Sequence, residues 1–297
     1  MSQCSLCLED KELVKSHLIP RAMYDYCRTA DSEPVLMTTE VMMQTSRQLQ
    51  DHLLCKLCED VLNVGGEQWL LPLLARIDQT FPLLGIVEKF PPHQVDGEWK
   101  GYAAFRNPEI EVDKLIHFAM GVYWKASVHS WTGSSREPRI ELGPYREKVR
   151  TFLRGETSFP KHMALVVDIL PRDKALISFN QPYRASAEGY HNFVFYVPGV
   201  QFIVSAGKQM PSDTPDICFA SNWAHPILVA GFSEEIKGLF RRIVVKAHKS
   251  QKLVHYLAGK KRNAFRPNCV RRPASKDFPL SRPASPSLNF NLHTHNL

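Results

Sequence analysis

Two pairs of cysteines near the N-terminus constrain this chain more than any other feature of its sequence. Each pair has the spacing Cys-x-x-Cys: the first is Cys4 and Cys7, and the second is Cys55 and Cys58. Four thiolates in two such pairs can close tetrahedrally around one Zn²⁺. The alternative is four thiols buried without a metal, which requires two such pairs to arise by chance among seven cysteines. The sequence therefore predicts one structural zinc ion bound by these four residues.

Length and composition indicate a globular protein with a sizeable core. The chain has 297 residues, of which 44% are hydrophobic and 23% charged, enough for one large domain or two small ones. No apolar run approaches the roughly 18 residues that a membrane span needs, and the polar start Met-Ser-Gln-Cys is unlike a secretion signal. The three other cysteines are isolated and odd in number, which favours a reducing compartment. We therefore expect a cytoplasmic protein with no membrane contact.

The positive charge of the chain is concentrated near its C-terminus. Residues 237–282 contain fourteen Lys or Arg against one Asp, whereas the first 236 residues carry a net charge of −6. A helix is predicted to begin at Ser233, with an apolar stripe on one side and basic residues on the other. The basic residues expected to bind nucleic acid, with DNA favoured, are Lys237, Arg241, Arg242, Lys246 and Lys249. The alternative is a solvated helix face followed by a disordered basic tail.

Four regions can be distinguished along the chain. Residues 1–66 contain the cysteine pairs, and residues 67–160 are mainly helical in pattern, with strand and turn signals over residues 81–112. Residues 161–260 combine strand patterns with the basic helix, and residues 261–297, rich in Pro and Ser, predict a disordered basic tail. Together these patterns predict an α+β protein: an N-terminal zinc module, a helical middle, and a C-terminal antiparallel sheet closed by an amphipathic basic helix.

The helical patterns can be placed more closely. A helix that begins near Cys55 is expected to break at the consecutive glycines 65 and 66, and a second helix is expected over 67–79. The stretch 112–131 is apolar on most sides and predicts a buried central helix, in which the histidines are structural. A further helix is predicted over 145–154, ended by a glycine.

Strand patterns begin at residue 163. Four segments rich in β-branched and aromatic residues, 164–169, 175–179, 192–197 and 200–205, predict an antiparallel sheet. A tight hairpin is expected at Pro198-Gly199, between the last two of them. The chain contains no GxGxxG, GxxxxGK[ST] or GxSxG motif, so we interpret the sheet as a scaffold.

The N-terminal motifs also resemble a known family. A Cys-x-x-Cys pair, the segment Ser16-His17-Leu-Ile-Pro20, and Leu-Leu-Cys-x-x-Cys-Glu ending at Glu59 are similar to the zinc-stabilised branch of the HNH endonucleases. The chain is most similar to an uncharacterised group of bacterial proteins of this size that carry these same motifs. The resemblance covers about residues 1–63. It implies a treble-clef zinc site that supports a ββα-metal core.

The resemblance implies a role for particular residues. His17 falls at the position of the general base that activates water, and Glu59 falls at the last ligand position for a catalytic Mg²⁺ or Mn²⁺. Ser16 stands where the family usually has a metal-binding Asp or His. The family's middle Asn falls near Gln50, and either that residue or its neighbours Asp51 and His52 would orient the base or complete the metal shell.

Each of these residues also has a structural interpretation. Glu59 in the first turn of a helix is stabilised by the helix dipole without any metal, and His17 can hydrogen-bond a carbonyl inside the zinc module. The sequence therefore supports a metal-dependent HNH-type endonuclease that cleaves phosphodiesters, with His17 and Glu59 as catalytic residues. The alternative is a non-catalytic zinc module that binds nucleic acid or a partner protein, in which Ser16 marks a lost metal ligand. A scaffold without nucleic acid is the third hypothesis.

Overall fold

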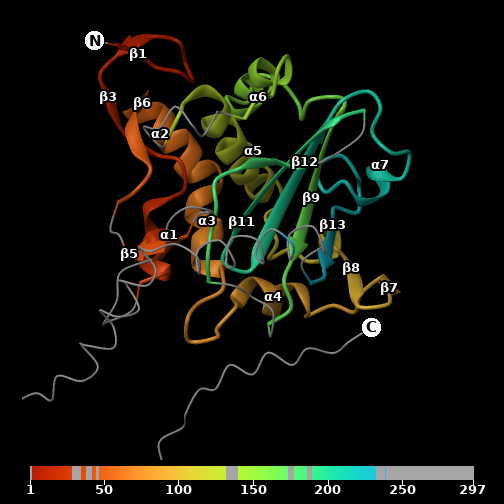
Figure 1. Ribbon diagram of the computed structural model, residues 1–297. Coiled ribbons are helices and arrows are strands. Elements are labelled where there is room, and N and C mark those ends of the chain that lie inside the picture. The colour runs from red at the N-terminus through yellow and green to blue at the C-terminus, as the bar shows by residue number, and fades with distance from the viewer. Residues whose placement is uncertain are drawn as a thin grey trace, which may run out of the picture. The chain divides into compact units, whose positions relative to one another are not determined.

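The computed structural model describes residues 2–28, 35–37, 42–44, 47–131, 140–172, 177–185, 189–231 and 238. They form a mixed α+β structure with a cysteine cluster near the N-terminus and a sheet in the C-terminal half, which confirms the predicted class (Figure 1). The predicted basic helix from Ser233 and the predicted disordered tail 261–297 lie outside the described residues. Among the described residues, no helix is both long and apolar enough to cross a bilayer.

The N-terminal region consists of short strands and one helix around the cysteines. β1 (Ser2–Gln3) pairs antiparallel with β2 (Asp10–Lys11), and the turn between them carries the first cysteine pair. β3 (Leu13–His17) pairs antiparallel with β6 (Gln50–Cys55), which leads directly into α2 (Lys56–Leu62). Between β3 and β6 the described elements are α1 (Arg21–Tyr26), β4 (Val35–Met37) and β5 (Met42–Gln44).

The helix that follows Cys55 does not break at the two glycines. α2 passes into a π-helical turn, η1 (Asn63–Glu67), then into α3 (Gln68–Leu70) and a 3-10 turn, η2 (Leu71–Leu73). The predicted break is therefore wrong, and the helix predicted over 67–79 ends at Leu73, before its expected end.

Close packing explains why glycine is tolerated there. A Cβ atom added to Gly65 would lie 2.3 Å from Nδ1 of His117, and one added to Gly66 would lie 2.5 Å from the carbonyl oxygen of Lys114. Both neighbours belong to α5 (Val112–Val128). Because glycine has no Cβ, η1 can approach α5 more closely than any other residue type would allow. The two glycines serve packing between helices, and the helix continues through them.

The middle of the chain supplies the helices that support this module. α4 (Pro82–Val87) is followed by α5, and α6 (Tyr145–Leu153) follows later. α5 and α6 confirm the helices predicted over 112–131 and 145–154. α6 ends at Leu153, and Gly155 two residues later has a φ of +71°, the left-handed conformation expected of a glycine that terminates a helix.

Seven strands form the large sheet. Their order is β10-β11-β12-β9-β13-β8-β7, and all neighbours are antiparallel except β13 and β9, which are parallel. The bounds are β7 (Gln94–Asp96), β8 (Trp99–Ala103), β9 (Met163–Ile169), β10 (Tyr183–Ala185), β11 (His191–Val197), β12 (Val200–Ala206) and β13 (Pro226–Val229). Two short helices flank β8 and β13, namely η3 (Ala104–Arg106) and α7 (Thr214–Ile217). The sheet therefore includes two strands, β7 and β8, from the region expected to be mainly helical.

Three of the four predicted strands are present as β9, β11 and β12. The tight turn between β11 and β12 is also confirmed, with Gly199 at a φ of +82°. The fourth prediction, 175–179, is not supported, because residues 177–179 lie in no strand and residues 173–176 lie outside the described residues. β10 pairs with β11 instead.

α5 joins the N-terminal region to the sheet (Figure 1). Its Phe118 and Tyr123 meet Phe195 and Phe202 of the sheet, with ring centroids 4.9 to 6.3 Å apart. The Tyr123 hydroxyl lies 2.7 Å from the carbonyl oxygen of Phe202. Aromatic contacts of this kind bury large areas and fix the orientation of the helix. α5 is thus a buried helix, as predicted, and residues on its other sides reach the cysteine-containing region.

Candidate functional site

The four cysteines converge at the N-terminal end of the molecule. The sulfur atoms of Cys4, Cys7, Cys55 and Cys58 all lie within 4.8 Å of one another, and three of the four residues are buried. In a tetrahedral site with Zn–S bonds of about 2.3 Å, neighbouring sulfurs lie about 3.8 Å apart. The cluster therefore needs only a small contraction to hold one ion, and a set of four thiolates suits zinc. The sequence correctly identified these four residues as a group.

Backbone hydrogen bonds shape the first cysteine pair into a knuckle. The amide of Cys4 donates to the carbonyl of Glu9 at 2.9 Å, and the amide of Leu8 donates to the carbonyl of Cys4 at 2.8 Å. Leu8 takes a left-handed conformation, with a φ of +64°. The amide of Cys55 donates to the Cys4 sulfur at 3.3 Å, which links the knuckle to the start of α2. Both pairs are thus held by tight local structure.

The protein environment favours the thiolate form at one of these positions. Burial opposes ionisation of Cys4, but backbone amides of Cys7, Cys55 and Leu6 outweigh it and lower the pKa of Cys4 to about 7. Burial raises the pKa of Cys58, which needs a cation to ionise at neutral pH. Ionisation is therefore favoured at Cys4 and opposed at Cys58.

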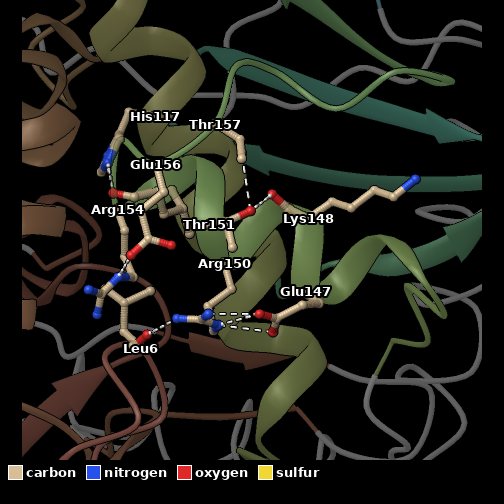
Figure 2. Close-up of polar contacts among 10 residues, drawn as sticks. Leu6, His117, Glu147, Lys148, Arg150, Thr151, Arg154, Glu156 and Thr157 are labelled. Carbon is tan, nitrogen blue, oxygen red and sulfur yellow. Dashed lines mark hydrogen bonds and ion pairs between the residues drawn. The ribbon is translucent and has the colours of Figure 1, made fainter.

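A side chain of α6 contacts the backbone of the knuckle. The Arg150 guanidinium donates to the carbonyl of Leu6 at 2.7 Å and to both carboxylate oxygens of Glu147 at 2.7 to 3.0 Å. Figure 2 shows this arginine reaching from α6 to the backbone of the knuckle. The same view shows His117 of α5 against the end of α6, where its Nε2 lies 3.1 Å from the Leu153 carbonyl. The other ring nitrogen of His117, Nδ1, is buried without a hydrogen-bond partner among the described residues, so the predicted structural role is met at Nε2 only.

The two positions that the family resemblance assigns to metal ligands touch each other. The Ser16 hydroxyl donates to Oε2 of Glu59 at 3.0 Å, which connects the end of β3 with the first turn of α2. Ser16 is fully buried. Burial raises the pKa of Glu59, while the nearby Lys125 charge and the Ser16 hydroxyl oppose that rise. The hydrogen-bond partner of Glu59 is therefore a hydroxyl, and its assignment as a metal ligand stays a prediction.

The His17 ring contacts Gln48, a residue that the sequence analysis did not identify as part of the site. Its Nε2 lies 2.8 Å from Oε1 of Gln48, and burial lowers the pKa of the imidazole. Gln50 is the cross-strand neighbour of His17, whereas Asp51 forms an ion pair with His129 at 3.0 Å. His52 lies on the exposed side of β6. Of the three residues considered as the family's middle Asn, none contacts the His17 ring in any hydrogen bond among the described residues.

A buried lysine lies beside this group. Lys125 of α5 donates from Nζ to the carbonyl oxygen of His17 at 2.7 Å and to Oε1 of Glu67 at 3.1 Å. The Lys125 side chain is 2% exposed and that of Glu67 is 17% exposed. The Lys125 charge also acts on Glu59, whose pKa it lowers. An ammonium ion therefore pairs with Glu67 and lies near Glu59 at the junction of β3, α2, η1 and α5.

Sequence reasoning missed Gln48, Glu67 and Lys125. One signal was available: Lys125 is the only charged residue between Lys114 and the end of α5, in an otherwise apolar helix. Charged residues inside such a helix are almost always paired. Its partners lie 58 and 108 positions away in the chain, so the fold alone could identify them.

Among the described residues, the four cysteines are the only group of three or more His, Cys, Asp or Glu placed to hold one metal ion. His17 and Glu59 are not part of such a group. Lys237, Arg241, Arg242, Lys246 and Lys249, which the sequence assigns to nucleic-acid binding, lie outside the described residues. The candidate site therefore consists of the cysteine cluster and the neighbouring polar group formed by Ser16, His17, Gln48, Glu59, Glu67 and Lys125.

No family model, no curated protein and no solved structure matches this chain.

Proposed function

We propose that this chain is a zinc-stabilised module of HNH-like design that binds nucleic acid without cleaving it. The four cysteines would hold a structural Zn²⁺ that folds β3, β6 and α2 together. The order of these elements is the strand, strand and helix that the resemblance implies. The observation that carries the proposal is the position of Lys125.

Lys125 supplies positive charge near Glu59, the residue that the resemblance assigns to the catalytic metal. Its ammonium group contacts the His17 backbone and Glu67, and its charge acts on Glu59. A divalent ion placed among the same groups would be repelled by this ammonium, since two cations a few ångströms apart in a poorly solvated site interact strongly. Because the Lys125 side chain is 2% exposed, it cannot contact a substrate phosphate in its place. The lysine therefore stabilises the fold of this group and opposes metal binding.

The side chains at positions 16 and 59 also disfavour binding of a catalytic metal. A hard divalent ion prefers carboxylate oxygens, whereas Ser16 offers a hydroxyl whose proton is already donated to Glu59. Burial also disfavours the charged form of Glu59. We infer that the positions equivalent to metal ligands have become a hydrogen-bonded structural pair.

The proposed partner follows from the distribution of charge. The first 236 residues carry a net charge of −6, and residues 237–282 carry +13. A basic segment of this density is attracted to polyanions, and nucleic acid, with DNA favoured, is the polyanion that a chain of this composition most often meets. In this proposal the zinc module and the sheet form the scaffold, and the basic segment supplies most of the affinity.

Binding to duplex DNA should depend steeply on salt. We expect log Kd to change with log salt concentration by about 0.9 for each phosphate contact. Replacing Arg241, Arg242 and Lys246 together with Glu should reduce that slope by about 3 and weaken binding strongly. Fluorescence anisotropy over a series of salt concentrations measures both quantities.

The matched control changes the same number of charges elsewhere. Lys100, Lys148 and Lys161 are exposed residues of the described region, and their replacement by Glu should alter the salt dependence much less. An affinity that responds neither to salt nor to the C-terminal change, or that responds equally to both triple changes, would contradict the proposed binding surface.

A second candidate function is the metal-dependent HNH-type endonuclease. The contact between Ser16 and Glu59 supports it, because a metal ion bound by both positions would need them to be close together. In this candidate His17, oriented by Gln48, is the general base, and a catalytic Mg²⁺ or Mn²⁺ binds after Lys125 moves away. Phosphodiester cleavage that depends on His17 separates the two candidates.

A further inference from the structure

An exposed aromatic pair lies beside β8 and β13, in elements of the sheet region. The Trp223 side chain is 74% exposed and that of Phe105 is 46% exposed, and both belong to the few large apolar residues on the described surface. Their ring centroids are 4.8 Å apart with an interplanar angle of 57°. The guanidinium of Arg106 lies 5.5 Å from the centroid of the Phe105 ring. We call Phe105, Arg106 and Trp223 the aromatic platform.

The backbone beneath the platform is fixed. The amide of Ala104 donates to the carbonyl of His225 at 3.1 Å, and the amide of Phe105 donates to the carbonyl of Ala224 at 3.4 Å. The loop that carries Trp223 is closed by the Asn222 side chain, which accepts from the Ala224 amide at 2.8 Å. The backbone of both halves of the platform is therefore held by hydrogen bonds, which lowers the backbone entropy lost on binding.

The chemistry of the platform fits a nucleobase and its phosphate. Two π-faces held at an angle provide stacking surface for a planar aromatic ring, and the exposed guanidinium beside them complements a negative charge. Among the described residues, Arg106 forms no ion pair with an acidic side chain, so its charge is available. A base inside a duplex offers no free face, whereas an unpaired base does.

We propose that the aromatic platform binds an unpaired base of single-stranded nucleic acid. This inference rests on the proposed nucleic-acid-binding function and adds to it the preferred form of the partner. The basic segment provides affinity for phosphates of any nucleic acid, and the platform provides the preference for strands whose bases are exposed. Stacking of this kind is tolerant of base identity, so the preference concerns strandedness and not sequence.

The test compares two oligomers with the same number of phosphates. The full chain is titrated against fluorescein-labelled oligothymidylate and against an abasic oligomer of equal length. Trp223→Ala should weaken binding to oligothymidylate roughly tenfold to a hundredfold and leave binding to the abasic oligomer unchanged. Trp223→Phe should retain most of the affinity, because it keeps a stacking ring. Leu57→Ala is the control, since Leu57 is also an exposed apolar residue but belongs to α2.

The binding measurements with the two oligomers either support or overturn the proposed role of the platform. Loss of affinity confined to the oligomer that has bases supports the platform. Unchanged affinity of Trp223→Ala for oligothymidylate, or an equal loss for both oligomers, would overturn the platform while the wild-type binding still supported the proposed function. A wild-type chain that binds neither oligomer nor duplex DNA would overturn the proposed function and the platform with it.

Discussion

Removal of zinc is expected to unfold the N-terminal region. Structural zinc contributes about 10–16 kcal/mol of binding free energy in small zinc-folded peptides, and whole domains are stable by only about 5–15 kcal/mol. Three of the four cysteines belong to the same hydrophobic core as α5 and the sheet, and Cys7 packs against that core, so the loss should spread beyond the knuckle. Elemental analysis should find one zinc per chain, and chelation should cause a large loss of helical signal and of thermal stability in circular dichroism.

Cys55→Ser tests the same claim in a single residue. It removes one of the four proposed ligands, so zinc content and thermal stability should both fall sharply. The control is Cys218→Ser, which makes the same chemical change at a buried cysteine outside the cluster and should keep its zinc. Folded protein without zinc, or equal effects of the two substitutions, would show that the cluster holds no structural metal.

Replacement of Lys125 is expected to lower the free energy of unfolding substantially. Lys125→Met keeps the volume of the side chain but leaves Glu67 and the His17 carbonyl without their buried donor. Breaking a buried ion pair by removing one partner costs about 3–5 kcal/mol. Because the Glu67 side chain is 17% exposed, we expect a loss near the lower end, about 3 kcal/mol, in denaturant unfolding monitored by circular dichroism.

Two further variants make this measurement specific. Adding Glu67→Gln to Lys125→Met removes the unpaired charge, and part of the lost stability should return. Lys56→Met breaks the exposed pair between Lys56 and Asp60, whose side chains are 72% and 45% exposed, and should change stability by less than about 1 kcal/mol. Equal effects of Lys125→Met and Lys56→Met would mean that Lys125 is not a buried counter-ion.

The sequence predicted those parts of the fold that local patterns specify. The cysteine spacing identified the cluster, continuous apolar residues identified α5, and β-branched segments identified β9, β11 and β12. In each case the physical cause is local, because spacing, periodicity and turn residues act over a few positions. The same holds for Gly199, whose positive φ is required by the turn between β11 and β12.

The missed features depend on contacts between distant segments. Gly65 and Gly66 do not break their helix because α5 packs against them, and nothing near residue 65 in the sequence reveals that neighbour. β7 and β8 lie in the stretch 81–112 that carries strand signals, but their place in the large sheet depends on β13, more than a hundred residues later. The prediction of the polar group beside the cysteine cluster was incomplete for the same reason. The sequence indicated His17 and Glu59, but Lys125 belongs to α5 and contacts His17 only in the folded structure.

The central claim is that Lys125 takes the place of a catalytic cation, so that the chain binds nucleic acid and does not cleave it. Its most direct test is the turnover of plasmid DNA, single-stranded DNA and RNA by the wild-type protein and by His17→Ala. Each reaction is run with Mg²⁺, with Mn²⁺, and without added divalent metal, on protein of verified zinc content. We predict no metal-dependent cleavage by either protein. Metal-dependent cleavage by the wild type that His17→Ala abolishes, with zinc content and fold intact, would contradict the claim and establish the endonuclease.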